Sequence, residues 1–286
     1  MGLFSFLSPK TAYIPGCTTY YKNKEELELY KEIFSRLGIS FRILDQHICS
    51  GIEAFEAGYE QETRKIAMKN LSIFQQEGIR KIITNSPEYY KIFSINYPEM
   101  LPYWDLEVVN LWDLILENLL KKHHLILEKP METITFHDSC HLGRHCKIYD
   151  EPRKILEILG YQIKEMDNSM GNSFCCGSCG GLNRTNKNLA NKIAKERILQ
   201  AKRIGVNKMV VTSLDNYNLL KANIRNTGIS VLELSEVLAE SLGIKKTIKE
   251  EIEDGDRILM EAKSNIRFQD ELKEEEYYDD YTYQNE

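Results

Sequence analysis

The cysteines of this chain are spaced in a way that could hold a metal. Five of the seven occur within a stretch of 40 residues, and three of them lie among glycines in the segment 174–181. The five are Cys140, Cys146, Cys175, Cys176 and Cys179. Iron–sulfur clusters and structural zinc are held by thiolates, and glycines let a backbone come close to an inorganic centre. The pattern therefore indicates a metal site built on cysteine sulfur.

The residues around these cysteines resemble those of a known family. The matching segments are His137–Arg144 (HDSCHLGR), Tyr149–Arg153 (YDEPR) and Gly180–Leu182, and 34 residues separate Cys140 from Cys175. The chain is similar, over residues 12 to about 240, to the CCG-domain proteins. That family includes the B subunit of heterodisulfide reductase, the iron–sulfur subunits of lactate and glycolate oxidation, and the C subunit of anaerobic glycerol-3-phosphate dehydrogenase. Its motif, a single Cys, then Cys-Cys-Gly, then Cys-x-x-Cys, occurs twice.

This chain also contains two copies, but the first has lost most of the ligands that the resemblance implies. Cys17 and Cys49 remain, with 31 residues between them. Serine or tyrosine stands at the other ligand positions, which are Ser50, Ser86 and Tyr89. Two thiolates alone do not hold a four-iron cluster. We therefore interpret Cys17 and Cys49 as a vestigial site, and His47 beside them as a surface histidine rather than a zinc ligand.

The second copy keeps the single Cys and the Cys-Cys pair, while Leu214 and Tyr217 replace its Cys-x-x-Cys. Two additional cysteines restore the number of thiols. Cys179 gives a Cys-x-x-Cys spacing with Cys176, and Cys146 follows Cys140 by six residues. We expect Cys140, Cys175, Cys176 and Cys179 to converge on one metal centre, with Cys146 as a fifth ligand or a nearby thiol.

Four interpretations of this site are open. The first is an iron–sulfur cluster, of the 4Fe-4S type that the resemblance implies. The second is zinc on the same thiolates, with His141 or His145 as a further ligand. The third is a thiol–disulfide pair, either Cys175 with Cys176 or Cys176 with Cys179. In the fourth, the chain binds no metal and serves as a structural subunit.

Three basic side chains near Cys140 are expected to surround the thiols without binding metal. His137 and His141 flank Cys140 and can hydrogen-bond a sulfur or the loop backbone, as side chains around a ligand set usually do. Arg144 can offset the negative charge of a thiolate-bound cluster. Asp138 is expected to cap the helix that follows Cys140. No residue is singled out as a catalytic acid or base.

The fold is expected to be α/β, with two pseudo-symmetric lobes that each contain a small parallel sheet flanked by helices. Helical patterns alternate with short strands at Leu37–Leu44, Lys81–Thr84, Met209–Thr212 and Ile229–Leu232. A helix over Asn110–Glu128 joins the lobes, and Leu232–Leu242 is the last helix of the second. The lobes span residues 1–128 and 129–244, and a partly helical, then disordered tail spans 245–286. Ligands at strand ends would face a shared cleft.

Composition excludes some classes of protein. The net charge of -6 and the absence of a basic stripe argue against nucleic acid as a partner. The longest apolar stretch, Leu111–Leu120, is interrupted by Asp113 and Glu117 and is too short to span a bilayer. The apolar segment Met1–Leu7 has no basic leader, so it is a poor signal peptide. Clustered cysteines without such a signal favour reduced thiols and a cytoplasmic location.

The tail from residue 270 carries eight acidic side chains, one lysine and four tyrosines, a composition too poor in apolar groups to form a core. A truncated chain that ends near Phe268 should therefore unfold at nearly the same temperature as the whole chain.

The resemblance implies an iron–sulfur subunit of a heterodisulfide-reductase-like or lactate-oxidation-like redox complex, in which electrons pass through one cysteine-ligated cluster. The alternative is a zinc-binding or metal-free assembly subunit of such a complex. No ferredoxin-type cysteine run and no flavin motif occurs in the sequence. Electrons must then come from flavoprotein or ferredoxin-type subunits, which could also place the chain at the inner face of a membrane. A disulfide or thiol is the candidate substrate.

Overall fold

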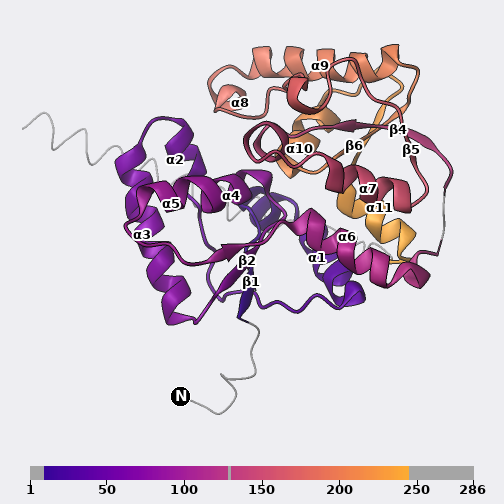
Figure 1. Cartoon of the computed structure of the whole chain (residues 1–286). Coiled ribbons are helices and arrows are strands. Elements are labelled where there is room, and N and C mark those ends of the chain that lie inside the picture. The colour runs from indigo at the N-terminus through magenta and orange to yellow at the C-terminus, as the bar shows by residue number, and fades with distance from the viewer. Residues whose placement is uncertain (1–9, 128–129, 245–286) are drawn as a thin grey trace, which may run out of the picture. The chain divides into compact units, whose positions relative to one another are not determined.

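The computed structural model of the chain describes residues 10–127 and 130–244 (Figure 1). The expectations for Met1–Leu7 and for the tail from residue 245 lie outside these residues. The joining helix is shorter than predicted, because it ends at Lys121 and a 3-10 turn at His123–Leu125 follows it instead of helix up to Glu128. The described residues form one compact unit. No helix among them is long and apolar enough to cross a membrane.

The first half of the chain, residues 10–127, contains a parallel sheet of three strands in the order β1-β2-β3. These strands are β1 (Thr11–Tyr13), β2 (Lys81–Ile83) and β3 (Glu107–Val108). The helices of this half are α1 (Lys24–Leu37), α2 (Ile52–Glu56), α3 (Glu60–Gln76), α4 (Pro87–Lys91), α5 (Tyr97–Met100) and α6 (Leu111–Lys121). Two π-helices, η2 (Thr18–Lys22) and η3 (Ile92–Asn96), and a 3-10 turn, η4 (His123–Leu125), complete it.

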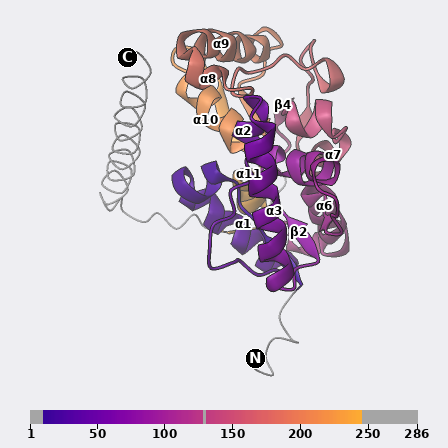
Figure 2. The same ribbon diagram turned by 90° about the vertical axis from the view of Figure 1, so that its left-hand side faces the viewer.

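The second half, residues 130–244, contains a parallel sheet of four strands in the order β5-β4-β6-β7. Its strands are β4 (Thr133–His137), β5 (Gln162–Ile163), β6 (Lys208–Val211) and β7 (Ser230–Glu233). Its helices are α7 (Asp150–Ile158), α8 (Leu182–Thr185), α9 (Lys187–Arg203), α10 (Leu214–Ala222) and α11 (Leu234–Ser241). The π-helix η5 (His141–His145) and the 3-10 turn η6 (Met170–Asn172) lie in its loops. Both views show α8, α9 and α10 together, away from α3 and β2 (Figure 2).

Two small parallel sheets flanked by helices confirm the predicted α/β class. The strand predicted at Leu37–Leu44 is wrong. Leu37 ends α1, Gly38 adopts the left-handed conformation after it, and the segment makes a single bridge, between Arg42 and Ala12. Ile39 and Leu44 are buried, so the apolar residues of this segment indicated burial in the core and not a strand. The segment after α1 runs beside β1 over too few residues to form a ladder of hydrogen bonds.

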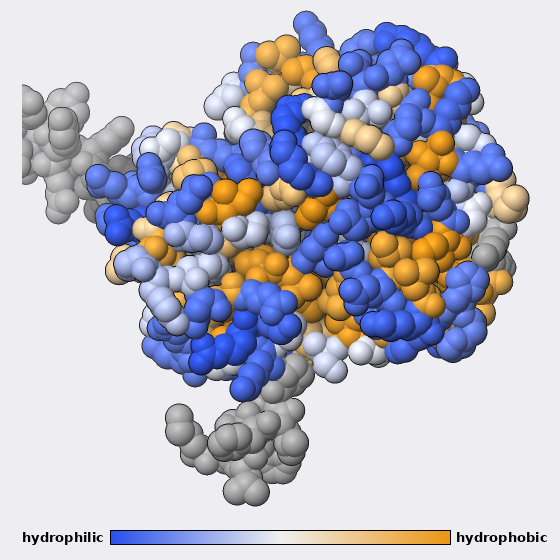
Figure 3. Space-filling model, viewed as in Figure 1, coloured by the Kyte–Doolittle hydropathy of each residue, from blue (hydrophilic) through white to orange (hydrophobic). Residues whose placement is uncertain are grey.

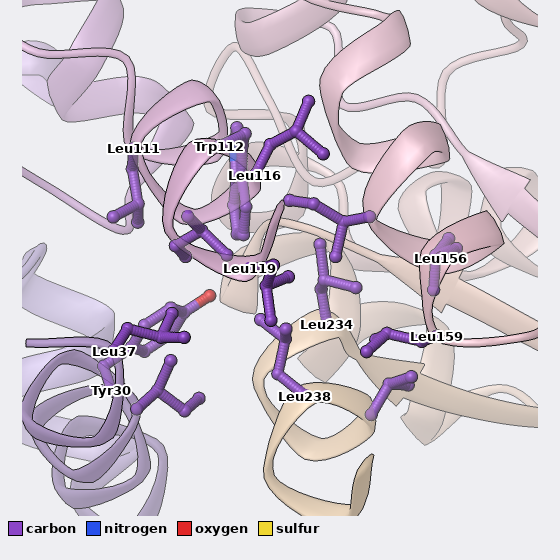
Figure 4. Packing of buried hydrophobic residues seen from close by; sticks show 14 of the residues in the cluster. Tyr30, Leu37, Leu111, Trp112, Leu116, Leu119, Leu156, Leu159, Leu234 and Leu238 are labelled. Carbon is purple, nitrogen blue, oxygen red and sulfur yellow. The ribbon is translucent and has the colours of Figure 1, made fainter. Parts of the chain in front are cut away.

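The largest hydrophobic core joins the two halves of the chain. Helices α1 and α6 from the first half pack with α7 and α11 from the second, as Figure 4 shows. Tyr30, Trp112, Leu119 and Leu238 are at most 2% exposed within it. Burial of one such aliphatic side chain contributes about 1.5–3 kcal/mol. On the outer face seen in Figure 3, hydrophobic patches are separated by hydrophilic residues.

Candidate metal centre

Cys140 lies at the end of a central strand of the second sheet. Strand β4 ends at His137, and the π-helix η5 begins directly after Cys140. The His145 N–H donates to the Cys140 carbonyl at 3.1 Å, which closes the wider turn. At Gly143 an added Cβ would lie 2.6 Å from a ring carbon of Tyr149, so this turn has no room for a side chain. Single π-turns occur frequently at functional sites.

The loop that carries the other three cysteines rests on α9. Gly177 has φ +90°, and a Cβ there would lie 2.9 Å from the Ala190 carbonyl oxygen. A side chain would therefore strain the backbone and also push the loop off the helix. Asn216 of α10 supports the loop from another side, because its Nδ2 donates to Ser178 Oγ at 2.6 Å.

Three of the predicted thiols contact one another. The sulfurs of Cys140 and Cys179 are 2.6 Å apart, and both thiols hydrogen-bond to Cys175. The backbone N–H of Gly177 also donates to the Cys175 sulfur, at 3.3 Å. The Cys140, His141 and Cys179 side chains each offer one donor atom within 4.8 Å of the others. Two loops far apart in sequence thus bring soft ligands to a single point.

Electrostatics at this point favour a thiolate. Hydrogen bonds from Cys140 and Cys179 lower the pKa of Cys175 far below the ordinary thiol value, and this effect outweighs burial. As the donor to Cys175, Cys140 has its pKa raised to about 12. The three groups therefore share one negative charge and two protons. A metal cation that displaced these protons would find its ligands already in contact.

Cys176 points into the core of the second half rather than directly at the other thiols. It is 1% exposed and packs in the hydrophobic cluster that contains Met166 and Ala194. Its sulfur lies 3.4 Å from Ser178 Oγ, and burial raises its pKa to about 11. It is near enough to Cys140 for their charges to interact.

Cys146 faces the first half of the chain. Its side chain packs on the core that joins the halves, and its thiol hydrogen-bonds to Ser94. Burial raises its pKa to about 11. It is not among the thiols that contact Cys140, so its role as a fifth ligand stays a prediction.

His137 lies behind the thiols as a neutral ring. It is 1% exposed, and its Nδ1 accepts a hydrogen bond from Arg197 Nε at 3.0 Å. Burial and then the charge of Arg197 lower its pKa well below the usual value. Arg197 is itself fully buried, and its other hydrogen bonds go to neutral acceptors on Asn168, Gln200 and Ser173.

His141 links the site to two carboxylates of the first half. Its Nε2 lies 2.6 Å from Glu56 Oε1, and its Nδ1 lies 3.4 Å from Glu88 Oε1. Burial lowers the pKa of His141, but the hydrogen bond to Glu56 and the nearby Glu88 carboxylate outweigh it and raise the pKa to about 9. The Gly180 N–H also donates to Glu56, at 3.3 Å. The ring is therefore an imidazolium beside the thiols.

Arg144 and Asp138 hold the backbone around the cysteines. The exposed Arg144 donates through Nη2 to the Ser173 carbonyl at 2.6 Å, next to the cysteine loop. Asp138 does not cap a helix. Its carboxylate pairs with Arg153 at 2.7 and 3.0 Å and accepts from the Met170 N–H at 2.7 Å.

Cys17 and Cys49 come together in the first half. Cys17 follows β1 and precedes η2, in the same relation that Cys140 has to β4 and η5. Its sulfur lies 3.2 Å from His47 Nε2 and 3.1 Å from the Tyr89 hydroxyl, and it hydrogen-bonds to Cys49. Tyr89, at a position where the resemblance implies a ligand, therefore completes this group.

The contacts from Glu56 and Glu88 were not predicted from sequence. Glu56 lies 85 residues before His141, and no motif connects the two. The internal repeat offered the only signal, because Glu88 lies between Ser86 and Tyr89, two of the replaced ligand positions. In the structure, Glu88 accepts from Ser86, the N-cap of α4, and also from Ser213, the N-cap of α10 in the second half.

Comparison with known proteins assigns both halves to one family. The model of the cysteine-rich domain called CCG matches residues 11–88 and 134–215. A probable iron-sulfur-binding oxidoreductase of Bacillus subtilis, FadF, is 34% identical over 222 residues, which are 74% of this chain and 31% of that protein. The D subunit of the dihydromethanophenazine:CoB–CoM heterodisulfide reductase of Methanosarcina acetivorans is 29% identical over 251 residues, 81% of this chain and 59% of that protein.

An EtfAB:quinone oxidoreductase of Syntrophomonas wolfei is 32% identical over 170 residues, 58% of this chain and 23% of that protein. The chain thus spans between about a quarter and three fifths of these curated relatives. Among solved structures, a hypothetical protein from Helicobacter pylori superposes with a TM-score of 0.61 at 15% identity, over 86% of this chain and 50% of that one. At this level of identity, the superposition shows a shared fold alone.

Proposed function

Because the chain belongs to the CCG cysteine-rich domain family, we propose that it is an iron–sulfur subunit of a redox complex, with a single cluster in its second half. The observation that carries this proposal is the contact among the Cys140, Cys175 and Cys179 thiols, which come from two separate loops. The relatives named for iron–sulfur binding, heterodisulfide reduction and quinone reduction support a redox role.

The side chains at this point suit an anionic metal–thiolate centre. Cys140, Cys175 and Cys179 would hold it, with Cys176 as the fourth thiol after a change of rotamer. Protonated His141 and the Gly177 N–H stabilise negative charge on the sulfurs, and buried Arg197 adds a positive charge behind them. When bound, a cluster of the 4Fe-4S type would supply one-electron transfer.

The residues around the site position it. Arg144 and Asp138 fix the backbone on either side of the cysteine loop, and Glu56 bridges His141 to the Gly180 N–H across the two halves. The first half contributes carboxylates here and its own site keeps only two thiols. This supports electron transfer at one centre rather than a mechanism that needs two clusters facing one substrate.

Flavoprotein or ferredoxin-type subunits would then exchange electrons with this site, in a complex similar to heterodisulfide reductase or to the lactate-oxidation system. A disulfide or a thiol is the substrate class that fits such a complex. The cytoplasm is the compartment that keeps the thiols reduced.

Metal and acid-labile sulfide analysis of anaerobically purified protein, together with its electronic spectrum, tests the proposal. Iron with sulfide supports it, whereas zinc without sulfide would replace it with a structural site on the same thiols. Cys179→Ala should lose most of the bound metal, because it removes a ligand and changes the volume little. Cys146→Ala is the matched control and should keep most of it, since that thiol faces Ser94. Full occupancy in Cys179→Ala would contradict the assigned ligand set.

A further inference from the structure

The pair Cys17 and Cys49 has the features of a reactive site rather than of a remnant. Cys49 is exposed, whereas Cys17 is half-buried behind it. The backbone of Cys49 is fixed, because Asn70 donates to its carbonyl at 2.8 Å and Tyr97 donates to the next carbonyl, of Ser50, at 2.9 Å. One sulfur is thus open to solvent on a rigid support, and a second lies within hydrogen-bonding reach of it.

The polar groups around Cys17 are placed to hydrogen-bond its sulfur and to take its proton when it reacts. His47 Nε2 is 3.2 Å away and the Tyr89 hydroxyl is 3.1 Å away. The His47 ring is held between Tyr20 and Tyr21, at centroid distances of 4.5 and 4.9 Å. If Cys17 only filled space in the loop, its sulfur would not need these two hydrogen-bonding partners.

A metal fits this group poorly. A closed structural zinc site needs four Cys or His ligands, whereas His47 Nε2, 3.2 Å from the Cys17 sulfur, adds only a third donor to the two thiols. Two adjacent thiols with fewer than four ligands suit two-electron chemistry between sulfurs instead.

We propose that Cys17 and Cys49 are a reversible redox pair, which closes to an intramolecular disulfide by reaction with a low-molecular-weight disulfide. Nothing in this proposal depends on metal in the second half of the chain. It gives the first half an activity of its own, in the place where the family motif has lost its ligands.

The reaction consists of two exchanges. The Cys49 thiolate attacks one sulfur of the small disulfide, so that a mixed disulfide forms on Cys49 and the first small thiolate leaves. Cys17 then gives its proton to His47 Nε2 and attacks the Cys49 sulfur, which forms the Cys17–Cys49 bond and releases the second small thiolate. Two protein thiols are oxidised and one small disulfide is reduced to two thiols. The Cys17 proton passes from His47 to the second leaving thiolate, and the first leaving thiolate takes from solvent the proton that Cys49 had released there.

The protonation of the pair agrees with this order. The hydrogen bond from Cys17, opposed by burial, lowers the pKa of Cys49 to about 6, so the exposed sulfur is the thiolate at neutral pH. The pKa of Cys17 is raised in turn. An exposed thiolate with a protonated neighbour is the usual arrangement of an attacking and a resolving cysteine.

Trypsin places the two cysteines in separate peptides, residues 11–22 and 43–64, which contain one cysteine each. Anaerobically reduced protein is equilibrated with oxidised and reduced glutathione at a series of ratios, quenched with acid, alkylated and digested. We expect a joined peptide, lighter than the sum of the two by two hydrogens, to replace at least half of the separate alkylated peptides at oxidising ratios. Dithiothreitol should restore the separate peptides.

Variants distinguish the two roles. Cys17→Ser should accumulate glutathione on Cys49, because no resolving thiol remains, whereas Cys49→Ser should react at least about tenfold more slowly at Cys17. Cys146→Ser, which changes a thiol with no thiol partner assigned to it, is the control and should leave the joined peptide unchanged. Separate alkylated peptides at every ratio would overturn the proposal. So would bound zinc that protects both cysteines and is lost in Cys17→Ser.

Discussion

Asp138→Asn tests how the backbone around the cysteines is held. The Arg153 guanidinium donates to both oxygens of Asp138 and to both oxygens of Glu165, and the Asp138 side chain is 2% exposed. Asparagine keeps one acceptor oxygen and nearly the same shape but removes the charge. A buried cation is then left with one carboxylate, Glu165, whose side chain is 33% exposed.

The expected cost follows from that geometry. Removing one member of a buried ion pair costs about 3–5 kcal/mol. Because Glu165 still neutralises Arg153, we expect Asp138→Asn to lower the free energy of unfolding by the smaller of these values, about 3 kcal/mol. For a domain of this size that corresponds to a fall in the unfolding temperature of about 6–12 °C. Thermal unfolding followed by circular dichroism on anaerobic, reduced protein measures it.

Glu165→Gln is the matched control, because it removes a charge from the same cation at a more exposed place, and about 1 kcal/mol is expected. If the cost in Asp138→Asn comes from the charge left on Arg153, the double variant with Arg153→Met should be less destabilised than the sum of the single variants. Equal effects of Asp138→Asn and Glu165→Gln would refute the reasoning. The metal content of Asp138→Asn should also fall, because its carboxylate accepts from the Met170 N–H ahead of the cysteine loop.

Two further predictions concern other parts of the molecule, and three variants test them. Burial raises the pKa of Glu233 to about 7, against hydrogen bonds from Ser235 and Tyr30, so the stability that its protonated form contributes is complete below pH about 4.5 and is lost as the pH rises through 7. Glu233→Gln should therefore gain about 2–3 kcal/mol relative to the parent chain between pH 4.5 and 8 in urea unfolding, and parallel pH profiles would contradict it. Gly177→Ala should reduce the metal content and lower the free energy of unfolding by more than about 2 kcal/mol, because the added Cβ meets α9. Gly180 has φ +63° but open space around it, so Gly180→Ala should lower the free energy of unfolding by about 1 kcal/mol. Equal losses of stability in the two variants would show that contact with α9 is unimportant.

The sequence was sufficient for the two sheets and for the contact among three thiols. Strand positions at Lys81–Ile83 and Lys208–Val211 follow from apolar runs next to helical patterns, and the repeat relates them. The predicted strand at Leu37–Leu44 failed because an apolar run reports burial, whereas a strand needs a neighbour along its length. The number of residues around Arg42 that pair with β1 can be seen only in the folded chain.

The side-chain directions could not be predicted either. A spacing of six residues suggested that Cys146 could join Cys140, but the turn between them is a π-helix, which changes the direction of the later residue. The carboxylates of Glu56 and Glu88 reach His141 across the two halves, and no local pattern encodes such a contact. The proximity of Tyr89 to Cys17 likewise depends on the approach of α4 to β1, where a Cβ on Gly16 would lie 2.7 Å from Ser86.

The core formed by α1, α6, α7 and α11 has a consequence for how this protein can change during evolution. A half that has lost most of its ligands is free to be deleted only if the other half is stable alone. Here a deletion of the first half would expose the apolar faces of α7 and α11 to water. It would also leave His141 without the two carboxylates that keep it charged. The ligand-poor half is therefore retained as a partner that folds with the other, and its cysteine positions can acquire new chemistry without loss of the fold.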